Sequence, residues 1–121
     1  VSGKTQLCVM KVDGPDISKY GVIAPGPVTN AVNGLVEKPD YKNAPSNMAS
    51  IGRYILKPDI FEILRNQPPG SGGEIQLADA INKQALMGNV ESITLDGERF
   101  DCGSVSGYLD AIFHKAERPL V

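Results

Sequence analysis

Residues 6–12, QLCVMKV, form an almost continuous apolar run near the start of the chain. A strand with one face in solvent alternates apolar and polar residues, whereas a strand covered on both faces reads as a nearly unbroken apolar segment. The run therefore predicts an interior strand that is covered on both faces. This restricts the fold, because other parts of the chain must lie above and below the strand.

Extended and helical segments alternate along the rest of the chain. Turn residues separate the expected strands, which are residues 20–24 (YGVIA), 35–39 (LVEKP), 48–56 (MASIGRYIL) and 90–95 (VESITL). Helical spacing and helix-end signals predict helices at 57–66, 74–88 and 106–116. In the second helix, Ile75, Ala78, Ile81 and Ala85 share one stripe, and Glu74 lies at the positive end of the helix dipole. Strands that alternate with helices indicate an α/β fold.

Charge and hydropathy exclude two classes of partner. The chain has 121 residues and a formal net charge of −2, so it lacks the basic field that gives proteins nonspecific affinity for nucleic acid. Its apolar runs all fall short of the about 18 residues that a membrane-spanning helix needs. We therefore expect one modest globular unit of cytoplasmic location, with neither nucleic acid nor a membrane as a partner.

Glu37 and Lys38 stand side by side where the predicted strand LVEKP ends at a proline. A carboxylate can accept hydrogen bonds from two vicinal hydroxyls, as sugars present them, and a lysine ammonium can neutralise a phosphate. The pair would therefore suit a sugar phosphate. The alternative is a solvated surface ion pair, which contributes about 0–1 kcal/mol to stability.

Asp101 follows an apolar segment and precedes a glycine-containing turn into a helix, where α/β proteins often bind ligands. Its carboxylate could hold Mg²⁺, which takes one or two protein carboxylates together with water and phosphate oxygens. Alternatively, Asp101 or Ser104 caps the following helix. Gly21 and Gly52 interrupt predicted strands, which indicates either a bulge or a close approach of the backbone to a ligand.

Five motifs occur in order over residues 20–111: YGVI, GLVEKP, APSNMASIGRYIL, GSGGEIQLADAI and RFDCGSVSGYLDA. Together they resemble the C-terminal part of the bacterial UTP–glucose-1-phosphate uridylyltransferases, also called UDP-glucose pyrophosphorylases. The resemblance implies the C-terminal portion of a Rossmann-like nucleotidyltransferase fold with a mixed sheet. It further implies that residues 1–121 are the sugar-binding part of a longer nucleotidyltransferase domain.

These enzymes form UDP-glucose and pyrophosphate from UTP and glucose 1-phosphate, with Mg²⁺ as the cofactor. The resemblance implies that Glu37 binds glucose hydroxyls and that Lys38 contacts the phosphate linked to the sugar. It implies that Asp101 is one of two aspartates that hold Mg²⁺, so Lys38 and Asp101 are the expected catalytic residues. Such a transfer between two anions needs positioning and charge neutralisation more than a covalent intermediate.

The resemblance also implies the remaining contacts of the sugar pocket. Gly21 resembles a backbone contact to the sugar, and Gly52, with Asn47 and Tyr54, resembles the wall of the same pocket. The intact enzyme is expected to be a homo-oligomer.

Two departures from the family pattern limit what this chain is expected to do. Many relatives have a lysine shortly after the DCG motif, where this chain has Val105 and Ser106. The chain also lacks the glycine-rich signature that surrounds the nucleotide in the family, so we do not expect the 121 residues alone to catalyse the transfer. The alternatives are a non-catalytic sugar-nucleotide-binding or regulatory module, or a nucleotidyltransferase for another hexose 1-phosphate or for dTTP.

Overall fold

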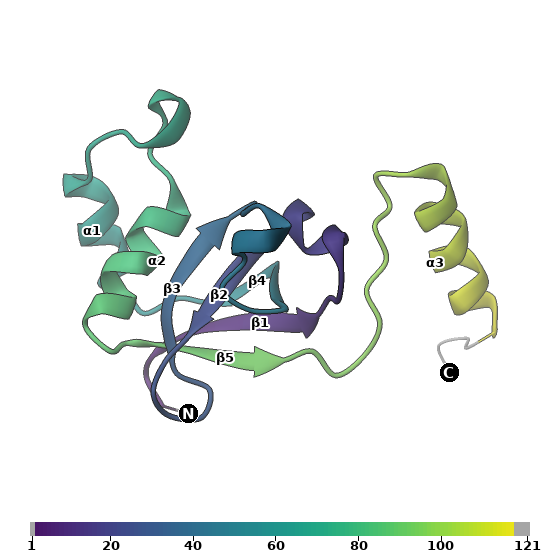
Figure 1. Cartoon of the computed structure of the whole chain (residues 1–121), viewed down its shortest axis with the longest axis horizontal. Coiled ribbons are helices and arrows are strands. Elements are labelled where there is room, and N and C mark those ends of the chain that lie inside the picture. The colour runs from purple at the N-terminus through teal and green to yellow at the C-terminus, as the bar shows by residue number, and fades with distance from the viewer. Residues whose placement is uncertain (1, 118–121) are drawn as a thin grey trace.

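A mixed five-stranded sheet organises the chain, of which the computed structural model describes residues 2–117 (Figure 1). The strands are β1 (Thr5–Lys11), β2 (Gly21–Pro25), β3 (Val32–Glu37), β4 (Met48–Ile55) and β5 (Val90–Thr94). Their order in the sheet is β3-β2-β4-β1-β5, with β1 parallel to β5 and all other neighbours antiparallel. The expected α/β class with a mixed sheet is therefore confirmed.

Three helices and three short 3₁₀ turns complete the described chain: α1 (Ile60–Asn66), α2 (Leu77–Leu86), α3 (Val105–Glu117), η1 (Pro15–Lys19), η2 (Tyr41–Asn43) and η3 (Ser71–Gly73). Helices α1 and α2 lie against one face of the sheet (Figure 1). The main core forms between them and the strands, from Leu7, Val9, Ile23, Val32, Leu35, Ile60, Ala80, Ile81, Ala85 and Val90.

Helix α2 begins at Leu77, three residues later than the sequence predicts. The predicted stripe is right for Ile81 and Ala85, which are buried, but wrong for Ile75, which is 54% exposed. The cause is the glycine-rich turn before the helix, in which the Gly70 amide donates a hydrogen bond to the Glu74 carbonyl at 2.8 Å. This bond leaves Glu74 extended, with ψ of 152°, so Glu74 cannot take part in the first helical turn.

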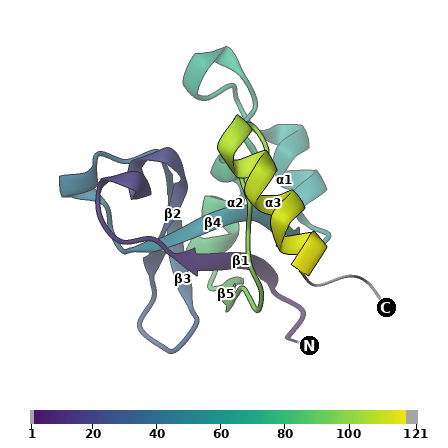
Figure 2. The same ribbon diagram turned by 90° about the vertical axis from the view of Figure 1, so that its right-hand side faces the viewer.

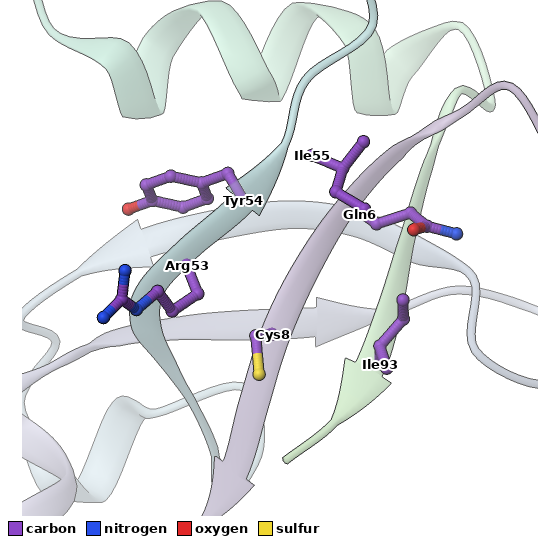
Figure 3. Close-up of a pocket in the computed structure, with 6 residues that line it drawn as sticks. All are labelled: Gln6, Cys8, Arg53, Tyr54, Ile55 and Ile93. Carbon is purple, nitrogen blue, oxygen red and sulfur yellow. The ribbon is translucent and has the colours of Figure 1, made fainter. Parts of the chain in front are cut away.

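Strand β1 is interior, between β4 and β5, but the prediction that both its faces are covered is wrong for the described chain. Thr5, Leu7 and Val9 are buried on the helical face, whereas the alternate side chains are only partly buried. At one end of the second face, a smaller core of Ile17, Val22 and Ala49 packs near η1. At the other end lies an open groove of about 240 Å³ (Figure 3), lined by Gln6, Cys8, Arg53, Tyr54, Ile55 and Ile93.

Both edges of the sheet are occupied. At the β3 edge, the Asn82 side chain of α2 accepts a hydrogen bond from the Leu35 amide at 2.6 Å and donates one to the Leu35 carbonyl at 3.0 Å. At the β5 edge, the Ser92 amide donates to the carbonyl of Asn30 in the β2–β3 loop at 2.8 Å. This loop lies beside the start of β5 (Figure 1 and Figure 2). Neither edge strand therefore leaves all of its backbone groups unpaired.

Helix α3 stands apart from the sheet at the end of an irregular segment, residues 95–104 (Figure 1). None of its described residues is buried, and its exposed large apolar side chains are Val105, Tyr108, Leu109, Ile112 and Phe113. Its contacts with the preceding segment include His114, whose Nδ1 lies 3.6 Å from a Glu98 carboxylate oxygen. No helix among the described residues is long and apolar enough to cross a bilayer.

Candidate functional site

Three residues form one row across three strands at the end of the sheet. Gly21 begins β2 and pairs with Glu37 of β3 on one side and with Ser50 of β4 on the other. Directly paired residues in antiparallel strands project to the same face, so Glu37 and Ser50 flank the position where Gly21 has no side chain. A Cβ atom at Gly21 would lie 3.1 Å from Glu37 Oε2 and 3.3 Å from Leu35 Cδ1. The glycine thus provides the space in which the Glu37 carboxylate lies.

A pocket of about 270 Å³, which we call the β2–β4 pocket, opens beside this row. It is lined by Lys19, Tyr20, Gly21, Leu35, Glu37, Ser50, Ile51, Gly52, Tyr54 and Arg99. Four of the six residues that the sequence suggests for substrate binding line this pocket, namely Gly21, Glu37, Gly52 and Tyr54. Their convergence from three strands makes the pocket the candidate site.

Gly52 lies in a bulge of β4. The register between β1 and β4 shifts between the pairs Leu7–Tyr54 and Val9–Ser50, which leaves extra residues on β4. Gly52 has φ of +79°, a left-handed conformation that glycine adopts without steric cost. The bulge, one of two alternatives that the sequence indicates for Gly52, is therefore present, and both Gly52 and Tyr54 line the pocket.

Lys38 has a left-handed backbone with φ of +44°, and its amide donates a hydrogen bond to the Tyr20 carbonyl at 3.0 Å. Its side chain is exposed and is not part of the pocket lining, although its neighbour Glu37 is. The chain therefore bends at Lys38 itself, immediately before the buried Pro39. The hydrogen bond to Tyr20, which lines the pocket, keeps the backbone of Lys38 next to the pocket.

Asn47 lies outside the β2–β4 pocket, contrary to the placement that the resemblance implies. It lines a separate hollow of about 230 Å³ with Asp13 and Ser46, and its Nδ2 donates a hydrogen bond to Asp13 Oδ1 at 3.1 Å. Asn47 precedes β4, whereas the pocket forms farther along the strand around Ser50 and Gly52. The length of β4 therefore separates Asn47 from Tyr54.

Asp101 organises the turn that leads into α3. Its Oδ1 accepts a hydrogen bond from the Gly103 amide at 2.9 Å, and the Gly107 amide donates to Ser104 Oγ at 3.1 Å. Ser104 thus caps the helix, as one sequence alternative predicted. Among residues 2–117, no group of three His, Cys, Asp or Glu side chains gathers to hold a metal ion. The Asp101 carboxylate is exposed and could supply one metal ligand.

The pocket also contains four polar residues for which the sequence indicates no role, namely Lys19, Tyr20, Ser50 and Arg99. The Arg99 guanidinium carbon lies 5.3 Å from the centre of the Tyr20 ring, and its Nη1 lies 3.4 Å from the Tyr20 hydroxyl. Within the described chain, the Ser50 hydroxyl is buried and has no hydrogen-bond partner. Its Oγ could therefore bind a polar group of a ligand.

Known proteins are similar to this chain in sequence and in fold. The profile of the nucleotidyl transferase family matches residues 2–118. The chain belongs to the nucleotidyl transferase family. A UTP–glucose-1-phosphate uridylyltransferase of Pseudomonas aeruginosa is 48% identical over 110 residues, which are 88% of this chain and 39% of that protein. Among solved structures, an apo UDP-glucose pyrophosphorylase aligns with 97% of this chain and 44% of its own at a TM-score of 0.85 and 41% identity.

A second solved structure, of a UDP-glucose pyrophosphorylase complexed with UDP-glucose, aligns with 95% of this chain and 45% of its own at a TM-score of 0.82 and 41% identity. The chain thus spans about 40% of the length of the relatives that it matches. These comparisons confirm the resemblance, seen in the sequence motifs, to part of the bacterial UTP–glucose-1-phosphate uridylyltransferases.

Proposed function

We propose that the protein carrying this chain forms UDP-glucose and pyrophosphate from UTP and glucose 1-phosphate. The observation that carries the proposal is the Glu37 carboxylate, which lies over the gap left by Gly21 inside the β2–β4 pocket. An ionised carboxylate accepts hydrogen bonds only, so it favours a ligand with several hydroxyl donors. The names of the similar enzymes support glucose 1-phosphate as this ligand.

The pocket residues have distinct roles in this proposal. Glu37 binds sugar hydroxyls, Gly21 and Gly52 let the backbone approach the sugar, and Tyr54 forms part of the wall. Lys38, next to Glu37 at the pocket entrance, neutralises charge on the phosphate. Holding the sugar phosphate in one orientation lowers the activation barrier of the transfer, because the reaction between the two bound substrates becomes effectively intramolecular.

Mg²⁺ is the cofactor that we propose, with Asp101 as one of its ligands. One exposed carboxylate fits the one or two that this ion takes from proteins, and phosphate oxygens and water supply the remaining ligands. The ion would neutralise the charge of the phosphates. Asp101 is one of the two aspartates that the resemblance implies, and residues 2–117 gather no group of three metal-ligating side chains, so we do not expect the 121-residue chain alone to catalyse the transfer.

The proposal is tested by measuring UDP-glucose and pyrophosphate formation by the intact protein with Mg²⁺. Glu37→Gln removes the charge but keeps the shape of the side chain, so we expect the KM for glucose 1-phosphate to rise about tenfold or more, with little change for UTP. Glu62→Gln on the exposed surface of α1 is the matched control and should behave like the wild type.

Three results would contradict the proposal or the role of Glu37 in it. A wild-type protein that binds glucose 1-phosphate without turnover would favour the non-catalytic sugar-binding module. Good turnover with dTTP and none with UTP would exclude the uridylyl assignment. If Glu37→Gln kept full activity, its role in sugar binding would be wrong.

A further inference from the structure

The β2–β4 pocket contains an anion and a cation that do not neutralise each other. Glu37 and Arg99 both line it, yet no ion pair forms between them in the described chain. A sugar phosphate complements these two charges, because its hydroxyl-rich end can donate hydrogen bonds to a carboxylate and its anionic end can bind a guanidinium. We propose that Arg99 contacts the phosphate of the bound sugar phosphate while Glu37 holds its hydroxyls. This inference rests on the function proposed above and names a further residue of the same site.

The other cation of the pocket, Lys19, and the carboxylate next to Arg99 in sequence, Glu98, have partners of their own. Asp16 lies 3.3 Å from the Lys19 ammonium, and Glu98, the residue before Arg99, lies near His114. Lys19, another cation of the pocket, is therefore already paired, whereas Arg99 has no carboxylate partner among residues 2–117. The unpaired cation of the pocket is thus the one that an incoming anion would meet.

Tyr20 holds Arg99 in place. The guanidinium lies over the aromatic ring, which is a favourable contact for a cation, and the Nη1 contact to the hydroxyl uses only one of its five N–H donors. The other donors stay available, and the planar guanidinium can bind two phosphate oxygens at once. A side chain that is already restrained loses less conformational entropy when it binds a ligand.

Tyr20 also joins Arg99 to Lys38. The Tyr20 ring contacts Arg99, and the Tyr20 carbonyl accepts the hydrogen bond from the Lys38 amide. One residue of the pocket wall therefore contacts the Arg99 side chain and the Lys38 backbone, which come from distant parts of the chain. Since a phosphate monoester carries up to two negative charges near neutral pH, two cations suit it better than Lys38 alone.

The test uses the intact protein and the variants Arg99→Ala and Arg99→Lys. We expect Arg99→Ala to raise both the KM and the directly measured Kd for glucose 1-phosphate about ten- to a hundredfold, while the KM for UTP changes less than about twofold. Arg99→Lys should restore only part of the affinity, because an ammonium cannot make the two-point contact. Arg65→Ala, an exposed arginine on α1, is the control and should leave both constants unchanged.

The outcomes separate this inference from the proposed function. An active wild type whose Arg99→Ala variant keeps its affinity for glucose 1-phosphate would overturn the inference alone. An equal rise in the KM for UTP would also overturn it, since Arg99 would then contact the nucleotide. If the wild type forms no UDP-glucose but binds glucose 1-phosphate, and Arg99→Ala loses that binding, the inference stands and the proposed function is wrong. The melting temperature of each variant shows that the fold is intact.

Discussion

Lys38 combines an expected chemical role with an unfavourable backbone. A residue with a Cβ atom at φ of +44° has a left-handed conformation that costs about 1–2 kcal/mol, and the following proline restricts it further. Lys38→Gly should remove this strain, whereas Lys38→Ala keeps it. We expect the glycine variant to be about 1 kcal/mol more stable than the alanine variant in urea denaturation. Both variants lose the ammonium and should show the same loss of UDP-glucose formation.

The two variants therefore separate strain from chemistry at one position. A glycine variant that is less stable than the alanine variant would show that the Lys38 backbone is unstrained. Equal activity of both variants and the wild type would remove Lys38 from the proposed phosphate contacts.

Gly21, Gly52 and Arg99 show which parts of the site a sequence can predict. Both glycines were visible as interruptions of strands, but their reasons differ: Gly21 makes room for a cross-strand carboxylate, and Gly52 adopts a positive φ in a bulge. Only the pairing of strands distinguishes these reasons. Arg99 was missed because its place in the pocket depends on Tyr20, which is 79 positions away in sequence.

Asn82 is the side chain that ties helix α2 to the edge strand β3. Its amide makes two hydrogen bonds to the backbone of Leu35, as a neighbouring strand would. Asn82→Ala leaves the amide and the carbonyl of Leu35 without these partners, and we expect a loss of about 1–3 kcal/mol in the free energy of unfolding. Asn82→Asp keeps the acceptor but places a carboxylate beside the Leu35 carbonyl, so it should also be destabilising.

Urea denaturation measures these changes, and the exposed Asn43→Ala in η2 provides a control that should stay within about 0.5 kcal/mol of the wild type. Hydrogen exchange of the Leu35 amide should become faster in Asn82→Ala. Unchanged exchange would mean that the strand keeps its edge position without Asn82.

The elements themselves were largely predictable, and the two main errors have different origins. The five strands and three helices were expected from apolar spacing and turn residues, and their boundaries are close to those observed. The late start of α2 arises from a backbone hydrogen bond within a glycine-rich turn, which leaves no apolar pattern to detect. The prediction that the second face of β1 is covered was wrong for a different reason. An apolar run shows only that a strand can be buried, whereas the segments that cover it must come from elsewhere in the chain.

Apolar surface is distributed unevenly over the whole molecule. The helical face of the sheet is buried, whereas the groove in Figure 3 and the apolar side of α3 are open. Ile112 and Phe113 of α3 are 47% and 63% exposed. Exposed apolar groups that lie near one another favour association, since removing apolar surface from water lowers the free energy.

We therefore expect the 121-residue chain, prepared alone, to bind a hydrophobic fluorescent dye and to elute above its monomer mass of 12.9 kDa at high concentration. The double substitution Ile112→Asn with Phe113→Ser should lower both signals, because it removes two exposed apolar side chains without touching the core. Lys115→Ser on the same helix is the control and should leave both signals unchanged. A chain that stays monomeric and binds no dye would contradict this prediction. It would show that the apolar side chains of α3 and of the groove are covered in solution, so that the double substitution has no exposed apolar surface to remove.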